Sequence, residues 1–359
     1  DPVTGESKGL LIEEARTNLN ASSIVFGNNN GSTSTTAALI APDGTLTASK
    51  IVENTASSEH GVTLPNLTYA SGTTYTLSVF AKSDGVRTGV RLLLPASHFG
   101  DNKMCIYNLS NGTLINGTGS GEPDASSITD VGNGYYRCTI TDAATADGDT
   151  TAGQIRIDNN PSNTSMSYAG NGFNGIYLWG AQLEAGSFPT SYIATAGSTA
   201  TRAVDAAAIT GSNFDFFSSG EGTIYSEHQS VATVNQRIYC INDGSNNNTF
   251  NGLISTSGGT GVNFEVRKDG VGYAFQPSAI TPVAGQIYRL AAAYAYNDVA
   301  ASRDGNTVSS DTSVITPAVN QMLIGSQSAT SKQSHTTIKK IAIYPKRLSN
   351  ATLKAMTTE

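Results

Sequence analysis

The sequence predicts an all-β protein of two antiparallel β-sandwich or jelly-roll domains with one short C-terminal helix. Three observations lead to this prediction. Gly, Ser, Thr and Asn, which are poor helix formers, account for 149 of the 359 residues. Apolar and polar residues alternate with a period of two in many short segments, as they do in half-buried strands. Turn dipeptides such as Asn-Gly and Asp-Gly separate these segments.

The first half of the chain contains four clear alternating segments. Within Thr73–Lys82, for example, every second residue from Tyr75 to Ala81 is apolar. The pattern places these side chains on one face of a strand and the polar ones on the other. Strands are expected at Thr73–Lys82, Tyr135–Ile140, Gln154–Asp158 and Gly175–Leu183.

The second half of the chain shows the same alternation of apolar and polar residues, but its sequence does not repeat that of the first half. Within Val262–Arg267, the residues Val262, Phe264 and Val266 are expected to face inward. The Asp304-Gly305 dipeptide lies inside Ala300–Val308 and indicates a hairpin turn. Further strands are expected at Gln236–Ile241, Val262–Arg267, Tyr288–Tyr294 and Ile338–Tyr344.

A single helix is predicted, at the end of the chain. Ser349 can cap its first turn by accepting from backbone amides. Leu348 and Leu353 have the spacing of a hydrophobic staple across that cap. We expect this helix to pack against the strand that carries Ile341 and Ile343.

The length is that of about two domains. The texture becomes small, polar and unpatterned near residue 200, which favours a connection there. We therefore place the first domain, with an N-terminal arm, at residues 1–195, a linker at 196–208, and the second domain at 209–359.

Composition excludes several classes of function. A net charge of -7, with only 14% charged residues, argues against nucleic-acid binding, which depends on clustered Lys and Arg. No apolar run approaches the roughly 18 residues of a membrane span, so we expect no membrane insertion. The three cysteines are too few for a disulfide scaffold; whether Cys105 and Cys138 are bridged is left open.

No catalytic constellation is recognisable in the sequence. The four histidines have no metal-ligand spacing, and neither a Gly-x-Ser-x-Gly elbow nor a phosphate-binding loop occurs. Glu13 and Glu14 are adjacent, so on a strand they point in opposite directions and cannot alone form a glycosidase pair. We expect the protein not to be an enzyme.

Three stretches of the first domain resemble a signature of tailed-bacteriophage structural proteins. They are Gly9–Leu19, Asp130–Cys138, and Gly175–Ile193 continued by Ala203-Val204-Asp205. The resemblance covers roughly residues 1–205. It implies a carbohydrate-binding-module-like sandwich on a virion appendage, and a homotrimer.

The second domain resembles concanavalin A-like lectins and laminin-G-type jelly rolls. The resemblance rests on Gly222–Tyr225, Tyr288–Ala291, Arg303–Asn306 and Ile341–Ser349. It implies glycan binding, in some members through calcium. No cofactor is otherwise expected.

Candidate binding residues follow from what a sugar needs, namely an aromatic face and planar polar groups. The alternative for each is a structural role in a core or at a hairpin tip. For calcium, which takes six to eight oxygen ligands, Asp142, Asp147 and Asp149 are the best cluster. The glycan candidates are Tyr135, Tyr136, Trp179, His98 and Asp101 in the first domain, and Tyr239, Asn242 and Asp243 in the second.

The leading functional hypothesis is a tail fibre, tailspike or head-fibre component that binds host surface polysaccharide as an adhesin. Its partners would be other virion structural proteins and further copies of itself. It would lie on the virion surface after assembly in the bacterial host cytoplasm. Two alternatives stay open: a capsid decoration or spacer protein with no ligand, and a polysaccharide depolymerase.

Overall fold

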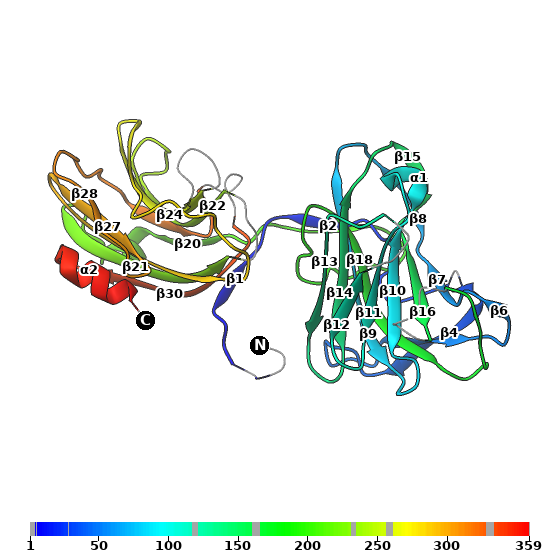
Figure 1. Ribbon diagram of the computed structural model, residues 1–359. Coiled ribbons are helices and arrows are strands. Elements are labelled where there is room, and N and C mark those ends of the chain that lie inside the picture. Colours follow the sequence, from blue (N-terminus) through cyan, green and yellow to red (C-terminus); the bar gives the residue numbers. More distant parts are fainter. Residues whose placement is uncertain are drawn as a thin grey trace. The chain divides into compact units, whose positions relative to one another are not determined.

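The computed structural model describes Thr4 and residues 6–27, 29–116, 121–159, 166–230, 235–255, 261–327 and 334–358. The chain forms two compact units (Figure 1). Unit 1 consists chiefly of Arg16–Arg202, and unit 2 of Ser7–Ala15 together with Ala203–Glu359.

Unit 1 is a sandwich of two six-stranded antiparallel sheets. Sheet I has the order β12 (Thr113–Asn116), β11 (Lys103–Asn108), β10 (Gly89–Leu94), β16 (Gln154–Asp158), β7 (Gly61–Thr63), β3 (Asn29–Asn30). Sheet II has the order β13 (Ala125–Asp130), β14 (Tyr136–Ala143), β9 (Thr74–Ser83), β18 (Gly175–Ala185), β5 (Ala48–Glu53), β4 (Ser32–Leu39).

Three two-stranded pairs complete unit 1 among the described residues. They are β15 (Gly148–Thr151) with β8 (Asn66–Tyr69), β17 (Tyr168–Ala169) with β6 (Ser57–Ser58), and β19 (Ala200–Arg202) with β2 (Arg16–Asn18). The β19 strand lies inside the predicted linker at 196–208, where Ala200, Thr201 and Arg202 pair with β2.

The core of unit 1 lies between its two sheets and follows the predicted alternation. On β9 its members are Tyr75, Leu77, Val79 and Ala81. Cys105 and Cys138 belong to the same core, and both are free thiols rather than a bridge. Burial raises the pKa of both thiols, so neither is a reactive thiolate.

Unit 2 is a second sandwich of two six-stranded antiparallel sheets. Sheet III has the order β1 (Leu10–Ile12), β30 (Thr336–Tyr344), β21 (Glu221–Ser230), β26 (Ile287–Ala295), β27 (Asp298–Arg303), β28 (Ser309–Asp311). Sheet IV has the order β20 (Ala207–Thr210), β29 (Gln321–Ile324), β22 (Gln236–Asn242), β23 (Thr249–Ser255), β24 (Gly261–Lys268), β25 (Val271–Phe275).

The all-β prediction of two sandwiches is therefore confirmed, and the inward side of β24 is as expected. Val262, Phe264 and Val266 are all buried in the core of unit 2. The Asp304-Gly305 dipeptide follows β27, which pairs antiparallel with β28, so the predicted hairpin is present.

The N-terminal arm belongs to unit 2 rather than unit 1, which corrects the expected domain boundary. Leu10 pairs with Ile338 on β30 (Figure 1), and Ile12 is only 2% exposed in the core of unit 2. Gly325 makes room for it: a Cβ there would lie 2.4 Å from Ile12 Cγ2, on a backbone with φ of +72°. Unit 1 is thus inserted, in sequence, between β1 and the rest of unit 2.

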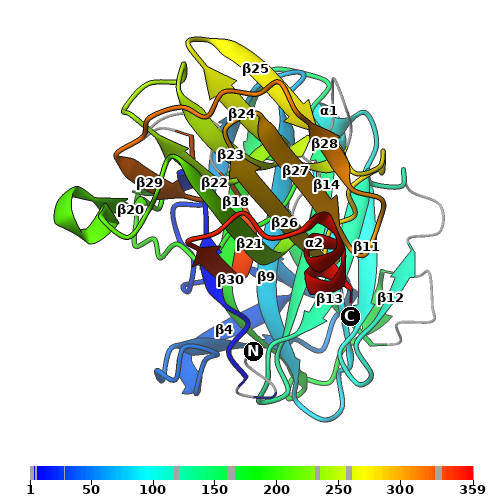
Figure 2. The same cartoon turned by 90° about the vertical axis from the view of Figure 1, so that its left-hand side faces the viewer.

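The C-terminal helix α2 (Asn350–Thr357) begins as predicted, with the Ser349 hydroxyl accepting from the Thr352 amide at 3.2 Å. It packs chiefly on β26 and β27 (Figure 2). Of the expected strand β30, Ala342 and Tyr344 pack against the cluster of Leu353, whereas Ile341 and Ile343 pack against the core. Leu353 is fully buried and shares a cluster with Leu348, as a staple requires.

Two further short helices occur in the described chain, α1 (Ala96–Phe99) and the 3₁₀ turn η1 (Gly211–Phe214). They had no signature in the sequence, since each is only one turn long. None of the helices in the described residues combines the length and the apolar content that crossing a membrane requires.

Candidate functional site

Three loops of unit 1 gather at one end of sheet II. The strands β5, β9 and β18 are neighbours, and their register pairs Gly175 with Val52 and Ile176 with Ser83. The end of β5, the end of β9 and the start of β18 therefore lie side by side. We call the loops 54–56, 84–88 and 170–174 at this end the Phe173 rim.

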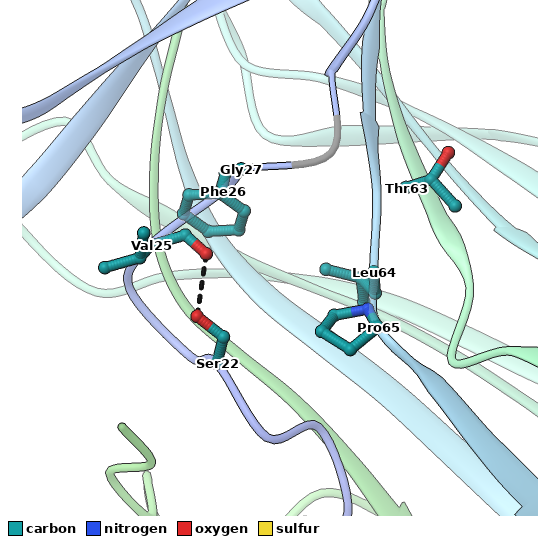
Figure 3. A pocket seen from close by; sticks show the side chains of 7 residues that line it. All are labelled: Ser22, Val25, Phe26, Gly27, Thr63, Leu64 and Pro65. Atoms are coloured by element: carbon teal, nitrogen blue, oxygen red, sulfur yellow. Dashed lines mark hydrogen bonds between the residues drawn. The ribbon is translucent and has the colours of Figure 1, made fainter. Parts of the chain in front are cut away.

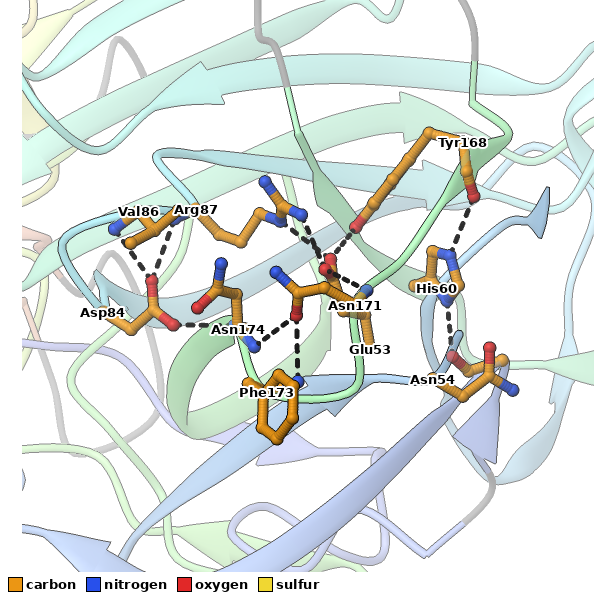
Figure 4. A network of polar contacts seen from close by, with 12 residues as sticks. Glu53, Asn54, His60, Asp84, Val86, Arg87, Tyr168, Asn171, Phe173 and Asn174 are labelled. Carbon is orange, nitrogen blue, oxygen red and sulfur yellow. Dashed lines mark hydrogen bonds and ion pairs between the residues drawn. The ribbon is translucent and has the colours of Figure 1, made fainter. Parts of the chain in front are cut away.

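A buried carboxylate ties the rim together (Figure 4). The Glu53 side chain is fully buried; Arg87 donates to it through Nε at 2.7 Å and Nη2 at 2.6 Å. The Tyr168 hydroxyl donates to it at 2.7 Å and the Asn171 amide at 3.0 Å. Burial alone would raise the pKa of Glu53, but these hydrogen bonds outweigh burial and lower it. The carboxylate is therefore ionised and holds three segments in place.

A second carboxylate fixes the backbone of the rim. Asp84 accepts from the amides of Val86 at 3.0 Å, Arg87 at 2.9 Å and Gly175 at 2.8 Å. Burial would raise the pKa of Asp84, yet these amides and the Lys50 ammonium group at 3.7 Å lower it. The hairpin after β9 is thereby fastened to the first residue of β18.

The 170–174 loop is closed by its own side chain. Asn171 Oδ1 accepts from the amide of Phe173 at 2.9 Å and from that of Asn174 at 3.0 Å. Lys50 Nζ donates to the Phe173 carbonyl at 3.3 Å. The backbone N–H and the backbone carbonyl of Phe173 are therefore both hydrogen-bonded.

What this rigid frame displays is an aromatic ring. Phe173 is 78% exposed, the largest fraction among the exposed large hydrophobic residues of the described chain, and Val86 across the rim is 55% exposed. The side-chain amide nitrogens of Asn54 and Asn174 donate to no other described residue. Lys50 Nζ lies 5.7 Å from the centre of the half-buried Tyr177 ring. The rim can hold a ligand that offers an apolar face together with hydroxyl or carbonyl groups.

His60 is buried and contacts the backbone of Tyr168, shortly before the 170–174 loop of the rim. Its Nδ1 lies 2.5 Å from the Gly31 carbonyl oxygen and its Nε2 lies 3.1 Å from that of Tyr168 (Figure 4). The centres of the His60 and Tyr168 rings are 4.6 Å apart. His60 therefore positions Tyr168 and does not face a ligand.

The aromatic candidates of the first domain are placed differently from what a binding surface needs. Tyr135 is fully buried and Trp179 is 3% exposed, because the outer face of sheet II carries a second apolar cluster. Trp179 Nε1 donates to Thr47 Oγ1 at 3.0 Å. Tyr136 is half-buried and packs against the core. A buried ring offers no free face to a sugar, so Tyr135 and Trp179 have structural roles.

His98 and Asp101 are not brought to the aromatic candidates. His98 lies in α1, which follows the C-terminal end of β10, whereas Arg87 precedes the start of β10. The centres of the His98 and Tyr69 rings are 5.6 Å apart. Its Nδ1 is 2.8 Å from the Ser97 hydroxyl, and it is 8% exposed. Asp101 is exposed in the following loop.

The candidates of the second domain shape a turn. Tyr239 is fully buried in the core of unit 2. Asn242 is 2% exposed and its Oδ1 accepts from the Gly244 amide at 3.0 Å. Asp243 is exposed and accepts from the Ser245 amide at 2.9 Å. Asn242 also accepts from Gln321 Nε2 at 2.7 Å, so the polar groups of Asn242 and Asp243 are engaged within the protein, and the Tyr239 hydroxyl is buried in the core.

The calcium candidates each serve a separate contact. Asp142 accepts from the Asp124 amide and lies 3.3 Å from Lys103 Nζ. Asp147 accepts from the Ser71 amide and Asp149 from the Thr68 hydroxyl. In the part of the chain that the structure describes, no three His, Cys, Asp or Glu side chains converge as metal ligands would. The three aspartates therefore do not fit a calcium site.

A hollow of about 240 Å³ lies elsewhere in unit 1 (Figure 3). Its walls are mostly apolar, and Ser22, one of its few polar side chains, already donates to the Val25 carbonyl at 2.8 Å. It offers little to orient a polar ligand. Its lining residues are Ser22, Val25, Phe26, Gly27, Thr63, Leu64 and Pro65.

Phe173 is not among the residues predicted from the sequence, although a local signal for it exists. Phe173 lies between two Asn-Gly dipeptides in Asn171–Gly175, so an apolar ring stands inside a turn sequence. An aromatic residue in such a place is not explained by a core. Glu53 and Arg87 carry no comparable local signal.

No protein-family model and no curated protein sequence matches this chain. Among solved structures, the CBM40 module of the Ruminococcus gnavus IT-sialidase is 17% identical over 39% of this chain and 84% of that one, with a TM-score of 0.33. The NanB sialidase of Streptococcus pneumoniae is 16% identical over 42% of this chain and 26% of its own, with a TM-score of 0.35. A SAP-like pentraxin from Limulus polyphemus is 11% identical over 38% of this chain and 69% of its own, with a TM-score of 0.31. Likenesses this distant carry no argument about function.

Proposed function

We propose that this chain is a carbohydrate-binding protein without catalytic activity, and that the Phe173 rim is the surface on which unit 1 holds a glycan. The observation that supports this most is a ring that is 78% exposed on a backbone held by buried Glu53 and Asp84. Displaying an apolar ring in water has no benefit for folding. Because the backbone that carries the ring is already held by hydrogen bonds, stacking of a sugar needs to order little more than the Phe173 side chain.

The polar groups of the rim suit the same ligand. Sugar hydroxyls both donate and accept, and the amide nitrogens of Asn54 and Asn174 are available as donors. The charges of Glu53 and Arg87 compensate each other, and so do those of Asp84 and Lys50. The rim therefore offers stacking and hydrogen bonds, with little net charge.

We propose further that this binding serves attachment of a tailed-phage virion to host surface polysaccharide. The three stretches that resemble phage structural proteins support this role. The protein would act on the virion surface, bound to other virion structural proteins and as a homotrimer. A particle mass near three times 37.2 kDa in solution would agree with the trimer.

The test is a glycan array probed with the whole chain, with Phe173→Ala and with Phe216→Ala. Phe216 is the matched control, an exposed phenylalanine of unit 2. Losing the stacked ring should weaken binding about 10-fold or more, while the control should bind like the parent chain. Unchanged binding by Phe173→Ala would remove the rim from consideration.

Two other outcomes would replace the proposal. If the parent chain binds no glycan and no host cell but attaches firmly to capsids, it is a decoration or spacer protein. If it releases reducing ends from host polysaccharide, it is a depolymerase, and a carboxylate pair must be sought in a groove.

A further inference from the structure

A polar groove in unit 2 involves none of the residues of the Phe173 rim and none of the sequence-predicted glycan candidates. It is formed where the start of β26, the turn after β27 and the end of α2 meet, and its volume is about 350 Å³. This is at the small end of the ~300–1,000 Å³ of ligand pockets. We call it the Asp304 groove; its lining residues are Gln286, Ile287, Arg289, Asp304, Thr357 and Thr358.

An acceptor in the groove is held in a fixed position. Asp304 Oδ1 accepts from the Arg289 amide at 2.8 Å, and Oδ2 lies 3.3 Å from Arg303 Nε. Arg303 is 1% exposed and is itself anchored, since its Nη2 donates to the Ser278 hydroxyl at 2.7 Å. The Asp304 side chain is still 30% exposed, so a ligand can reach the carboxylate.

Donors surround this acceptor. The Gln286 amide oxygen accepts from the Tyr288 hydroxyl at 3.2 Å, which orients its amide nitrogen, and that nitrogen donates to no other described residue. The half-buried Arg289 guanidinium lies 3.5 Å from Glu227. Thr358 donates its hydroxyl hydrogen to the Lys354 carbonyl at 2.8 Å, so its oxygen can accept from a ligand. Donors and acceptors thus alternate around a small space.

The charges in the groove are already compensated. Asp304 has Arg303 as its counter-ion, and Arg289 has Glu227. An anion would meet the Asp304 carboxylate and the carbonyl end of α2, which carries partial negative charge. A cation would meet the Arg289 guanidinium group and would compete with the buried Arg303 for Asp304. A neutral ligand meets neither penalty.

We infer that the Asp304 groove is a second ligand site, for a neutral polyhydroxylated molecule the size of a sugar ring or a polyol. Each hydroxyl of such a ligand donates to an acceptor such as Asp304 and accepts from donors such as Gln286 or Arg289. Ile287 supplies apolar contact for its C–H groups. The site works whether or not the Phe173 rim binds anything.

The experiment is an NMR titration of the whole chain, followed by the side-chain signals of Gln286 and Arg289. The probes are glucose, galactose and sorbitol, with glucuronate and glucosamine as charged counterparts of glucose. Neutral probes should shift these signals at millimolar concentrations. The two charged probes should bind about 10-fold more weakly or worse.

Asp304→Asn tests the carboxylate without dismantling the turn. Asparagine tolerates the left-handed backbone at this position, where φ is +45°, and keeps an oxygen for the Arg289 amide. It should bind the neutral probes about 10-fold more weakly, since hydrogen bonds to ionised groups are the stronger ones. Asp311→Asn is the matched control: an equal loss of charge at a turn of the same unit, where Asp311 bonds only its own turn residue Ser313.

The results separate this site from the rim. Groove shifts that persist in Phe173→Ala and weaken in Asp304→Asn support the inference, even if the glycan array is negative. The inference is overturned if no neutral probe shifts the groove signals, if Asp304→Asn and Asp311→Asn bind alike, or if glucuronate or glucosamine binds as well as glucose.

Discussion

His228 makes unit 2 sensitive to acid in a way that can be calculated. It lies on β21 with its side chain completely buried, and neither ring nitrogen has a hydrogen-bond partner among the residues that the structure describes. The centre of the Tyr288 ring lies 6.0 Å from that of His228. Burial lowers the pKa of His228 from 6.5 to about 3. His228 therefore stays unprotonated in the folded unit at pH values where it takes up a proton in the unfolded chain.

The sign and size follow from proton linkage. The stability that depends on a neutral His228 is fully present above pH 6.5 and is lost as the pH falls towards 3, by about 1.4 kcal/mol per pH unit. Between pH 7 and pH 5 the free energy of unfolding of unit 2 should therefore fall by about 2 kcal/mol. This is a large share of the stability of a typical domain.

The assay compares the parent chain with His228→Phe and His228→Gln by urea unfolding at pH 7, 6 and 5. Neither replacement titrates, so the parent should lose about 2 kcal/mol more than either variant between the extremes. Trp179 is the only tryptophan and lies in unit 1, so its fluorescence follows that unit while circular dichroism follows both. The fluorescence transition should be the same in all three proteins. An equal acid loss in parent and variants would refute the reasoning.

Two further predictions concern the arm and the rim. Ile12→Ala should lower the stability of unit 2 by about 2–4 kcal/mol, because Ile12 fills its core from the far end of the sequence; urea unfolding with an unmoved tryptophan transition checks this, and a shift confined to that transition would contradict it. Glu53→Gln should cost unit 1 about 3 kcal/mol, because Arg87 keeps a largely buried charge without a counter-ion. The tryptophan transition should move in this variant and glycan binding should weaken; binding at full strength would show that the network does not position Phe173.

The sequence predicted what is encoded locally. The alternation from Tyr75 to Ala81 reflects one buried face, and the cap at Ser349 depends on residues within one helical turn. The strand β1 could not be found this way, since it is three residues long and its partner Ile338 comes more than three hundred residues later. Short strands have no period of their own to recognise.

The burial of Trp179 and Tyr135 could not be predicted from the sequence for a related reason. Period-two alternation gives two faces, and a strand with one core face was expected to expose the other, which made Trp179 and Tyr135 attractive. In the structure a second apolar cluster that includes Ala41 covers that other face. Glu53 meets Arg87 across 34 residues and Tyr168 across 115, so only the completed sheets bring them together.

The scarcity of charge in this chain takes on a clearer meaning once the ion pairs are located. Arg91 and Asp158 meet at 2.6 Å with both side chains 1% exposed, and Glu53 and Arg87 form a similar pair. Removing such ions from water costs about as much as their attraction returns, so these pairs are poor sources of net stability. They are, however, screened little by salt and strict about geometry. The small polar residues act alongside them at the surface, where Asn111 and Asn171 accept from backbone amides of their own turns. Buried ion pairs of this kind, together with turns that bond their own backbone, hold loops by interactions that salt screens little, and a ring such as Phe173 can be displayed on them.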